Sequence, residues 1–228
     1  MSKISQKRNK TSDFLTEISE KTSSHSLKEN AILINVNSFR IIVKFKEKEI
    51  IIDKEVNDLD RFVLKFLNHI RHLTSYVIVS GYVAIVMGRP RATDDVDILV
   101  PKMTKEFFAR VWNGLEKDGF WCLNTTDMED AYELLKTNSI RFAIHPQITP
   151  NIELKWCKNT VDQESLKNPI SIVIDRNPIQ VAPLELQIAY KEIALKGNKD
   201  KEDAAHIRDV AKGFLDEDLI DAYKRALK

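Results

Sequence analysis

Cysteine is scarce in this sequence: Cys122 and Cys157 are far apart and belong to no CxxC or Cys–His pattern. Two cysteines exclude a disulfide framework, and their spacing argues against a structural zinc site. We interpret both as reduced thiols in the core. Long apolar runs are missing as well, because no stretch approaches the length of a membrane span and the N-terminus lacks the apolar core of a signal peptide. We therefore expect a soluble, cytoplasmic protein without a membrane partner.

An excess of charge of either sign is also absent. The 228 residues include 35 Lys and Arg against 34 Asp and Glu, a formal net charge of +1. No overall basic field therefore favours nucleic acid. The N-terminal residues supply some Lys and Arg, but acidic residues interleave with them and no aromatic–basic face accompanies them, which argues against a nucleic-acid-binding scaffold. With 43% hydrophobic residues the chain can bury a core, in one large domain or two small ones.

Periodicity predicts a hairpin, a helix and then a mixed α/β centre. Residues 1–30 are rich in Ser, Lys, Thr and Glu, which is typical of a flexible or loosely docked tail. Alternating apolar residues predict a hairpin within 32–53, and apolar residues three and four apart predict a helix over 59–73. In the centre we expect further strands and two helices, the helices beginning near Thr104 and Thr126. These strands are predicted at 76–79, 95–100, 120–123, 140–144 and 152–156.

The last third of the chain predicts a hairpin over 170–181 and then only helices. Pro183 suits a first helical position, and this helix is expected to end at Gly197. Two more helices are predicted over 200–214 and 216–227, each with an acidic first turn. The order of elements indicates an α/β or α+β fold. We divide the chain into a tail (1–30), an α/β core that includes the hairpin (31–182) and a C-terminal helical part packed on it (183–228).

Asp95 and Asp97 are the strongest candidates for chemistry. They lie two residues apart on a predicted strand, so both side chains leave the same face, about 7 Å apart along the chain. Two like charges on one face are unfavourable unless a cation lies between them, and carboxylate oxygens suit Mg²⁺. An Asp-x-Asp pattern alone is more typical of a solvated edge strand, so its context decides.

The residues before this pair suit anionic oxygens. Ser80 and Gly81 follow an apolar strand and precede a predicted helix, where backbone N–H groups point at a ligand and Gly permits close approach. Arg91 and Thr93 offer a guanidinium and a hydroxyl for phosphate. Taken singly, each is as well explained by an ordinary turn. Glu153 is a third candidate carboxylate, an acid among apolar neighbours on a short strand, where a charge is costly unless it is paired or bound to metal.

Together these residues resemble the nucleotidyltransferase (DNA polymerase β-like) superfamily. The resemblance is carried by residues 79–100: Val79-Ser80-Gly81-Tyr82, then Gly88, Arg91, Thr93, Asp95 and Asp97. It is greatest to the small prokaryotic branch related to AbiEii-type toxin nucleotidyltransferases and to antibiotic nucleotidyltransferases. Ser80 stands where the family usually has Gly. The fold that the resemblance implies is a mixed β-sheet flanked by helices, here with an N-terminal hairpin extension and C-terminal helices.

The resemblance also implies an activity. A nucleoside monophosphate would pass from an NTP, such as ATP, to a hydroxyl of a small molecule, an RNA end such as that of tRNA, or a protein. Asp95, Asp97 and Glu153 would hold Mg²⁺ or Mn²⁺, and Glu153 would help to deprotonate the acceptor. The residues that would face the nucleotide are Ser80, Gly81, Arg91, Thr93, Lys191 and Asp203. As an alternative, the chain would be a catalytically silent module of this fold with a binding or regulatory role.

Overall fold

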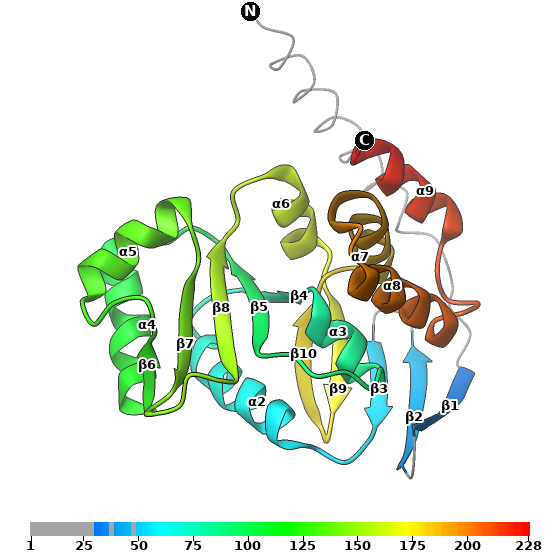
Figure 1. Cartoon of the computed structure of the whole chain (residues 1–228), viewed down its shortest axis with the longest axis horizontal. Helices are drawn as coiled ribbons and strands as arrows, with labels where there is room; N and C mark the ends of the chain where they lie inside the picture. Colours follow the sequence, from blue (N-terminus) through cyan, green and yellow to red (C-terminus); the bar gives the residue numbers. More distant parts are fainter. Residues whose placement is uncertain (1–29, 37–38, 47–48) are drawn as a thin grey trace, which may run out of the picture.

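The computed structural model describes residues 30–36, 39–46 and 49–228, and these form one mixed sheet with helices around it (Figure 1). The strands are β1 (Asn30–Val36), β2 (Phe39–Lys46), β3 (Glu49–Asp53), β4 (Val77–Val79), β5 (Asp95–Val100), β6 (Phe120–Cys122), β7 (Ile140–Ile144), β8 (Asn151–Trp156), β9 (Ile170–Ile174) and β10 (Asn177–Val181). The helices are α2 (Asp58–Ile70), α3 (Gly81–Val86), α4 (Lys105–Lys117), α5 (Met128–Thr137), α6 (Thr160–Lys167), α7 (Leu184–Tyr190), the π-helix η1 (Lys191–Leu195), α8 (Asn198–Val210) and α9 (Glu217–Ala226).

The strand order across the sheet is β1-β2-β3-β9-β10-β4-β5-β8-β7-β6. The pairs β3–β9, β10–β4 and β5–β8 are parallel and the remaining neighbours are antiparallel. The expected mixed α/β sheet is therefore confirmed. The N-terminal hairpin is present as β2 and β3, and β1 adds a third strand to it. In Figure 1 the helices α7, α8 and α9 gather near the β1 end of the sheet, and α4 and α5 lie near β6.

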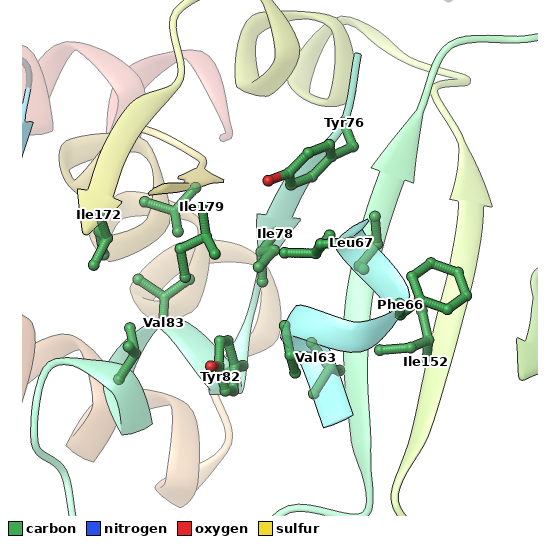
Figure 2. Packing of buried hydrophobic residues seen from close by; sticks show 14 of the residues in the cluster. Val63, Phe66, Leu67, Tyr76, Ile78, Tyr82, Val83, Ile152, Ile172 and Ile179 are labelled. Atoms are coloured by element: carbon green, nitrogen blue, oxygen red, sulfur yellow. The ribbon is translucent and has the colours of Figure 1, made fainter. Parts of the chain in front are cut away.

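One face of the sheet is a continuous apolar surface. Ile78 pairs with Ile98, and Ile152 pairs with Val96, so these side chains share a face and are all fully buried. Helix α2 covers this face with its apolar stripe, and Figure 2 shows Val63, Phe66 and Leu67 beside the sheet residues. The residues on the opposite face of β5 belong to the candidate active site.

Several helix boundaries differ from those predicted. Helix α2, predicted to begin after a cap at Asn57 or Asp58, is capped by Asn57 and ends at Ile70, so Leu73 lies beyond it. Asp127, not Thr126, accepts the first N–H bonds of α5. Pro183 is the residue before α7, and the expected continuous helix to Gly197 is a short α-helix followed by the π-helix η1. Helix α8 begins at Asn198, two residues before the predicted start.

Helix α6 was not predicted at all. Its sequence has a weak apolar stripe and few large apolar residues, so periodicity gives little signal. Its one clear mark is a capping box, in which Asn159 accepts from the Asp162 N–H and Asp162 accepts from the Asn159 N–H. This helix matters because it covers the face of β5 that carries Asp97.

The predicted tail, residues 1–30, lies outside the described residues except for Asn30, where β1 begins. Cys122 and Cys157 are both free thiols, Cys122 buried and Cys157 half-buried. Within residues 30–36, 39–46 and 49–228, no helix is long and apolar enough to cross a bilayer.

Candidate active site

The three predicted carboxylates meet on two neighbouring strands. Strands β5 and β8 are parallel, and their register places Asp97 directly opposite Glu153. Paired residues of parallel strands project from the same face of the sheet, and Asp95, two residues before Asp97, shares that face. Between them Val96 is fully buried on the other face. The alternation inferred from the sequence therefore holds, and it gathers acidic side chains where the sheet is not covered by its apolar core.

Lys155 lies between two of these acids. Its Nζ is 2.6 Å from Asp97 Oδ1 and 3.3 Å from Glu153 Oε1. Burial would lower the pKa of Lys155, but the two carboxylates outweigh burial and raise it. Two further side chains contact Glu153. Ser139, just before β7, donates its hydroxyl to Glu153 at 2.6 Å, and Arg141 on β7 lies 3.4 Å from the same carboxylate.

These partners keep Glu153 ionised. Burial would raise the pKa of Glu153, but the hydrogen bond from Ser139 and the positive charges of Lys155 and Arg141 more than offset burial, so the pKa is lowered. Sequence reasoning missed Lys155, although strand alternation from Glu153 would have placed it on the same face.

The Ser80–Gly81 turn lies beside Asp97, because β4 and β5 are antiparallel and Val79 pairs with Asp97. Ser80 has φ 68° and ψ −136°, a conformation that favours glycine. Its N–H donates to Gln187 Oε1 at 2.9 Å. A Cβ on Gly81 would lie 2.8 Å from Arg91 Nη2, so only glycine lets this guanidinium lie against the turn.

A second charged group stands next to the turn. Asp203 of α8 is fully buried and accepts from Lys191 of η1 at 2.8 Å and from Arg91 at 2.8 Å. Arg89 binds the other oxygen of Asp203 and also reaches Glu202. Three positive side chains from the 88–93 loop and η1 thus converge on one buried carboxylate, which brings together three residues predicted separately, Arg91, Lys191 and Asp203.

A cavity of about 230 Å³ connects the two groups. Of the predicted residues, Ser80, Asp97 and Lys191 line it, and Lys155 and Gln187 line it as well. The other predicted residues do not line this cavity: Gly81, Arg91, Thr93, Asp95, Glu153 and Asp203. Thr93 Oγ1 donates to Asp95 Oδ1 at 3.2 Å, so the hydroxyl that was expected to meet phosphate meets a carboxylate here.

The carboxylate oxygens of this site are ligands that suit a hard divalent cation. The ammonium group of Lys155 pairs with both Asp97 and Glu153, so a positive charge already lies between these two carboxylates. In the described part of the chain, no three side chains of His, Cys, Asp or Glu are grouped closely enough to hold a metal ion. A metal bound by all three acids therefore needs Lys155 to move away and Asp95 to turn from Thr93.

No protein-family model matches the sequence, and no curated protein matches it. Among solved structures, the fold is similar to the antibiotic-resistance factor ANT(2'')-Ia in solution, with a TM-score of 0.48 and 16% identity over 75% of this chain and 92% of that one. It is also similar to ANT(2'')-Ia in complex with adenylyl-2''-tobramycin, with a TM-score of 0.47 and 16% identity over 73% of this chain and 95% of that one. Because both TM-scores lie below 0.5, we base the functional proposal on the residues of the site alone.

Proposed function

We propose that this protein is a metal-dependent nucleotidyltransferase, which transfers a nucleoside monophosphate from an NTP to a hydroxyl acceptor and releases pyrophosphate. One observation carries the proposal: the register of β5 and β8 pairs Asp97 with Glu153 on the face that also carries Asp95. Acids gathered on one face are costly unless a cation joins them, and they occur here beside a tight turn with basic side chains against it.

The residues fit Mg²⁺ or Mn²⁺ in donor type. We assign Asp95, Asp97 and Glu153 as the ligands. The ammonium group of Lys155 marks a point where two of these carboxylates already bind a positive charge. When bound, such an ion neutralises charge on the phosphates and lowers the pKa of a hydroxyl.

The chain's own residues then have separate tasks. The absence of a side chain at Gly81 lets the guanidinium of Arg91 lie against the turn, where it can bind a phosphate. Lys191 and Asp203 fix that guanidinium, because Asp203 holds both cations. Thr93 orients Asp95 through its hydroxyl. These are positions that the resemblance assigns to nucleotide binding, and the contacts support a positioning task for each.

In the reaction, the acceptor oxygen attacks the α-phosphorus in line, an O–P bond forms, and the bond between the α-phosphorus and its bridging oxygen breaks. Pyrophosphate leaves with that oxygen. The proton of the acceptor hydroxyl passes to the carboxylate of Glu153, which Ser139, Lys155 and Arg141 hold in its ionised form. When this proton arrives, Glu153 loses its negative charge. Lys155 and Arg141 then have fewer negative partners in the protein, and both can attract the phosphates.

The test is transfer of label. The purified chain is incubated with each α-labelled NTP, Mg²⁺ or Mn²⁺ and a cell extract, and labelled small molecules, RNA and protein are separated. We expect label in one of these fractions, and we expect Asp97→Asn to reduce it by at least about a hundredfold, since even residues outside the ligand shell often cost 10–100-fold. Asp221→Asn, an exposed change on α9, serves as the matched control.

Equal labelling by the wild type and Asp97→Asn would refute the assignment of this site. Binding of NTP without any transfer would favour the alternative, a catalytically silent module of this fold. The fraction that carries the label also identifies the acceptor as a small molecule, an RNA or a protein, a choice that the residues named here leave open.

A further inference from the structure

The cavity beside Asp97 has a buried polar atom in its wall. Gln187 of α7 is 5% exposed, and its Oε1 accepts the N–H of Ser80 at 2.9 Å. Its Nε2 has no hydrogen-bond partner within the described residues. The bond from Ser80 fixes which end of the amide is which, so the free end is a donor. A buried donor without a partner costs about 1–3 kcal/mol, and in a cavity wall it points to a ligand with an acceptor atom.

The rest of the wall excludes a strongly charged ligand. Two carboxylates, Asp97 and Asp162, are balanced by two ammonium groups, Lys155 and Lys191. A polycation or a polyanion would therefore find half of the charged groups repulsive. The remaining surface is largely apolar. Its members come from β4 and β5, from the residue after β10, from α6 and α7, and from η1: Val79, Leu99, Val161, Ala182, Leu186, Tyr190 and Leu195.

The mouth of the cavity suits a flat ring. Tyr190 is 38% exposed and Leu195 is 44% exposed, which is unusual for large apolar residues on a packed helix. An exposed aromatic ring next to an apolar slot is a stacking platform for a base. The volume of about 230 Å³ is below the range of about 300–1,000 Å³ for a pocket that encloses a drug-sized molecule, so the cavity takes part of a ligand.

We infer that this cavity holds the base and ribose of the donor nucleotide, and that Gln187 Nε2 donates a hydrogen bond to an acceptor atom of the base. The inference rests on the proposed function, because the cavity is lined by Asp97, assigned there to the metal, and by Ser80, the neighbour of Gly81 in the phosphate-binding turn. The base and ribose are the uncharged part of an NTP, which matches the balanced charge of the walls. Glu153 does not line the cavity, so the acceptor hydroxyl approaches from the β7 side, past Ser139 and Arg141.

The experiment compares NTPs with inorganic tripolyphosphate, which has the phosphates but no base. Calorimetry with Mg²⁺ and α,β-methylene analogues of the four NTPs measures affinity without turnover. We expect at least one analogue to bind the wild type ten or more times more tightly than tripolyphosphate. In Gln187→Glu the carboxylate still accepts from Ser80 but offers no donor, and that ratio should fall at least tenfold. Gln163→Glu adds the same charge at an exposed position of the neighbouring α6 and should leave the ratio unchanged.

A second variant tests the cavity independently of the amide. Val161→Phe narrows the apolar slot from α6, so it should weaken NTP analogues and leave tripolyphosphate as before, with an unfolding curve close to that of the wild type. Equal affinity of the wild type for tripolyphosphate and all four analogues would overturn this inference and leave the proposed function standing. An unchanged ratio in Gln187→Glu would also overturn it. Failure of both tripolyphosphate and the NTPs to bind would contradict the proposed function itself.

Discussion

Ser80 shows how one residue is held in an unfavourable backbone conformation at the candidate site. Its φ of 68° with ψ −136° lies in a region that L-residues other than glycine seldom adopt. Its side chain makes no capping hydrogen bond to α3 that would offset the cost. The conformation is maintained by its surroundings: Gln187 accepts the Ser80 N–H, and Arg91 lies against the next residue, Gly81.

Ser80→Gly is therefore expected to stabilise the protein. A residue in such a region is strained by about 1–3 kcal/mol, whereas glycine costs only about 0.5–1 kcal/mol in extra chain entropy. The net gain in the free energy of unfolding should be roughly 1 kcal/mol, measured by urea denaturation. Ser80→Ala keeps the strain and should give no gain. If both variants shift stability equally, the hydroxyl and not the backbone is responsible.

At the level of single residues, sequence reasoning succeeds where neighbours along the chain determine the position. Asp95 and Asp97 share a face because a strand alternates, and Glu153 joins them once β8 is placed next to β5. Gln187 gave no signal, since 107 residues separate it from Ser80 and an amide in an apolar helix resembles any other core-flanking residue. Contacts that depend on tertiary packing were out of reach.

Among the elements, the 88–93 loop, η1 and α8 are tied together through one carboxylate. Asp203 is fully buried and meets Arg89, Arg91 and Lys191. Replacing it with Asn removes the negative charge and leaves buried cations with fewer partners. Breaking a buried ion pair in this way typically costs about 3–5 kcal/mol.

We therefore expect Asp203→Asn to lower the free energy of unfolding by about 3 kcal/mol or more, measured by denaturant titration. Asp209→Asn, an exposed position on the same helix, controls for the loss of an acidic residue from α8 and should change stability little. A small effect of Asp203→Asn would mean that the cations reach solvent or the other acids, Asp200 and Glu202, without cost.

The elements also show where periodicity is informative. Strong apolar stripes predicted α2 and α4, the latter with its cap at Thr104, and alternation predicted the hairpins. Helix α6 was missed because its stripe is weak, and the break at Tyr190 was missed because a π-helix differs from an α-helix by one hydrogen-bond step that the sequence does not mark. Both omissions border the cavity, so the sequence alone predicted Asp97 and the helical segment after Pro183 but neither α6 nor the change to a π-helix.

At the scale of the whole molecule, the C-terminal helices share the core of the sheet. Leu186 of α7, Ile207 of α8 and Ile220 of α9 belong to the same buried cluster as Ile78 and Ile98 of the central strands. Helices α7, α8 and α9 therefore bury apolar side chains in the core of the sheet as well as against one another. Separate folding of the two parts would expose much of this shared surface.

This shared core predicts one cooperative unfolding transition. The three tryptophans, Trp112, Trp121 and Trp156, all precede residue 183, so their fluorescence reports on the α/β part alone. Far-UV circular dichroism reports on the helices of both parts, including those of residues 183–228, which carry no tryptophan. In a urea titration the two signals should have the same midpoint within error, as two-state unfolding requires. A chain ending at residue 182 should lose fixed structure, because it lacks Leu186, Ile207 and Ile220 and their share of the buried cluster. A circular dichroism transition that follows or precedes the fluorescence transition would instead show that the C-terminal helices fold as a unit of their own.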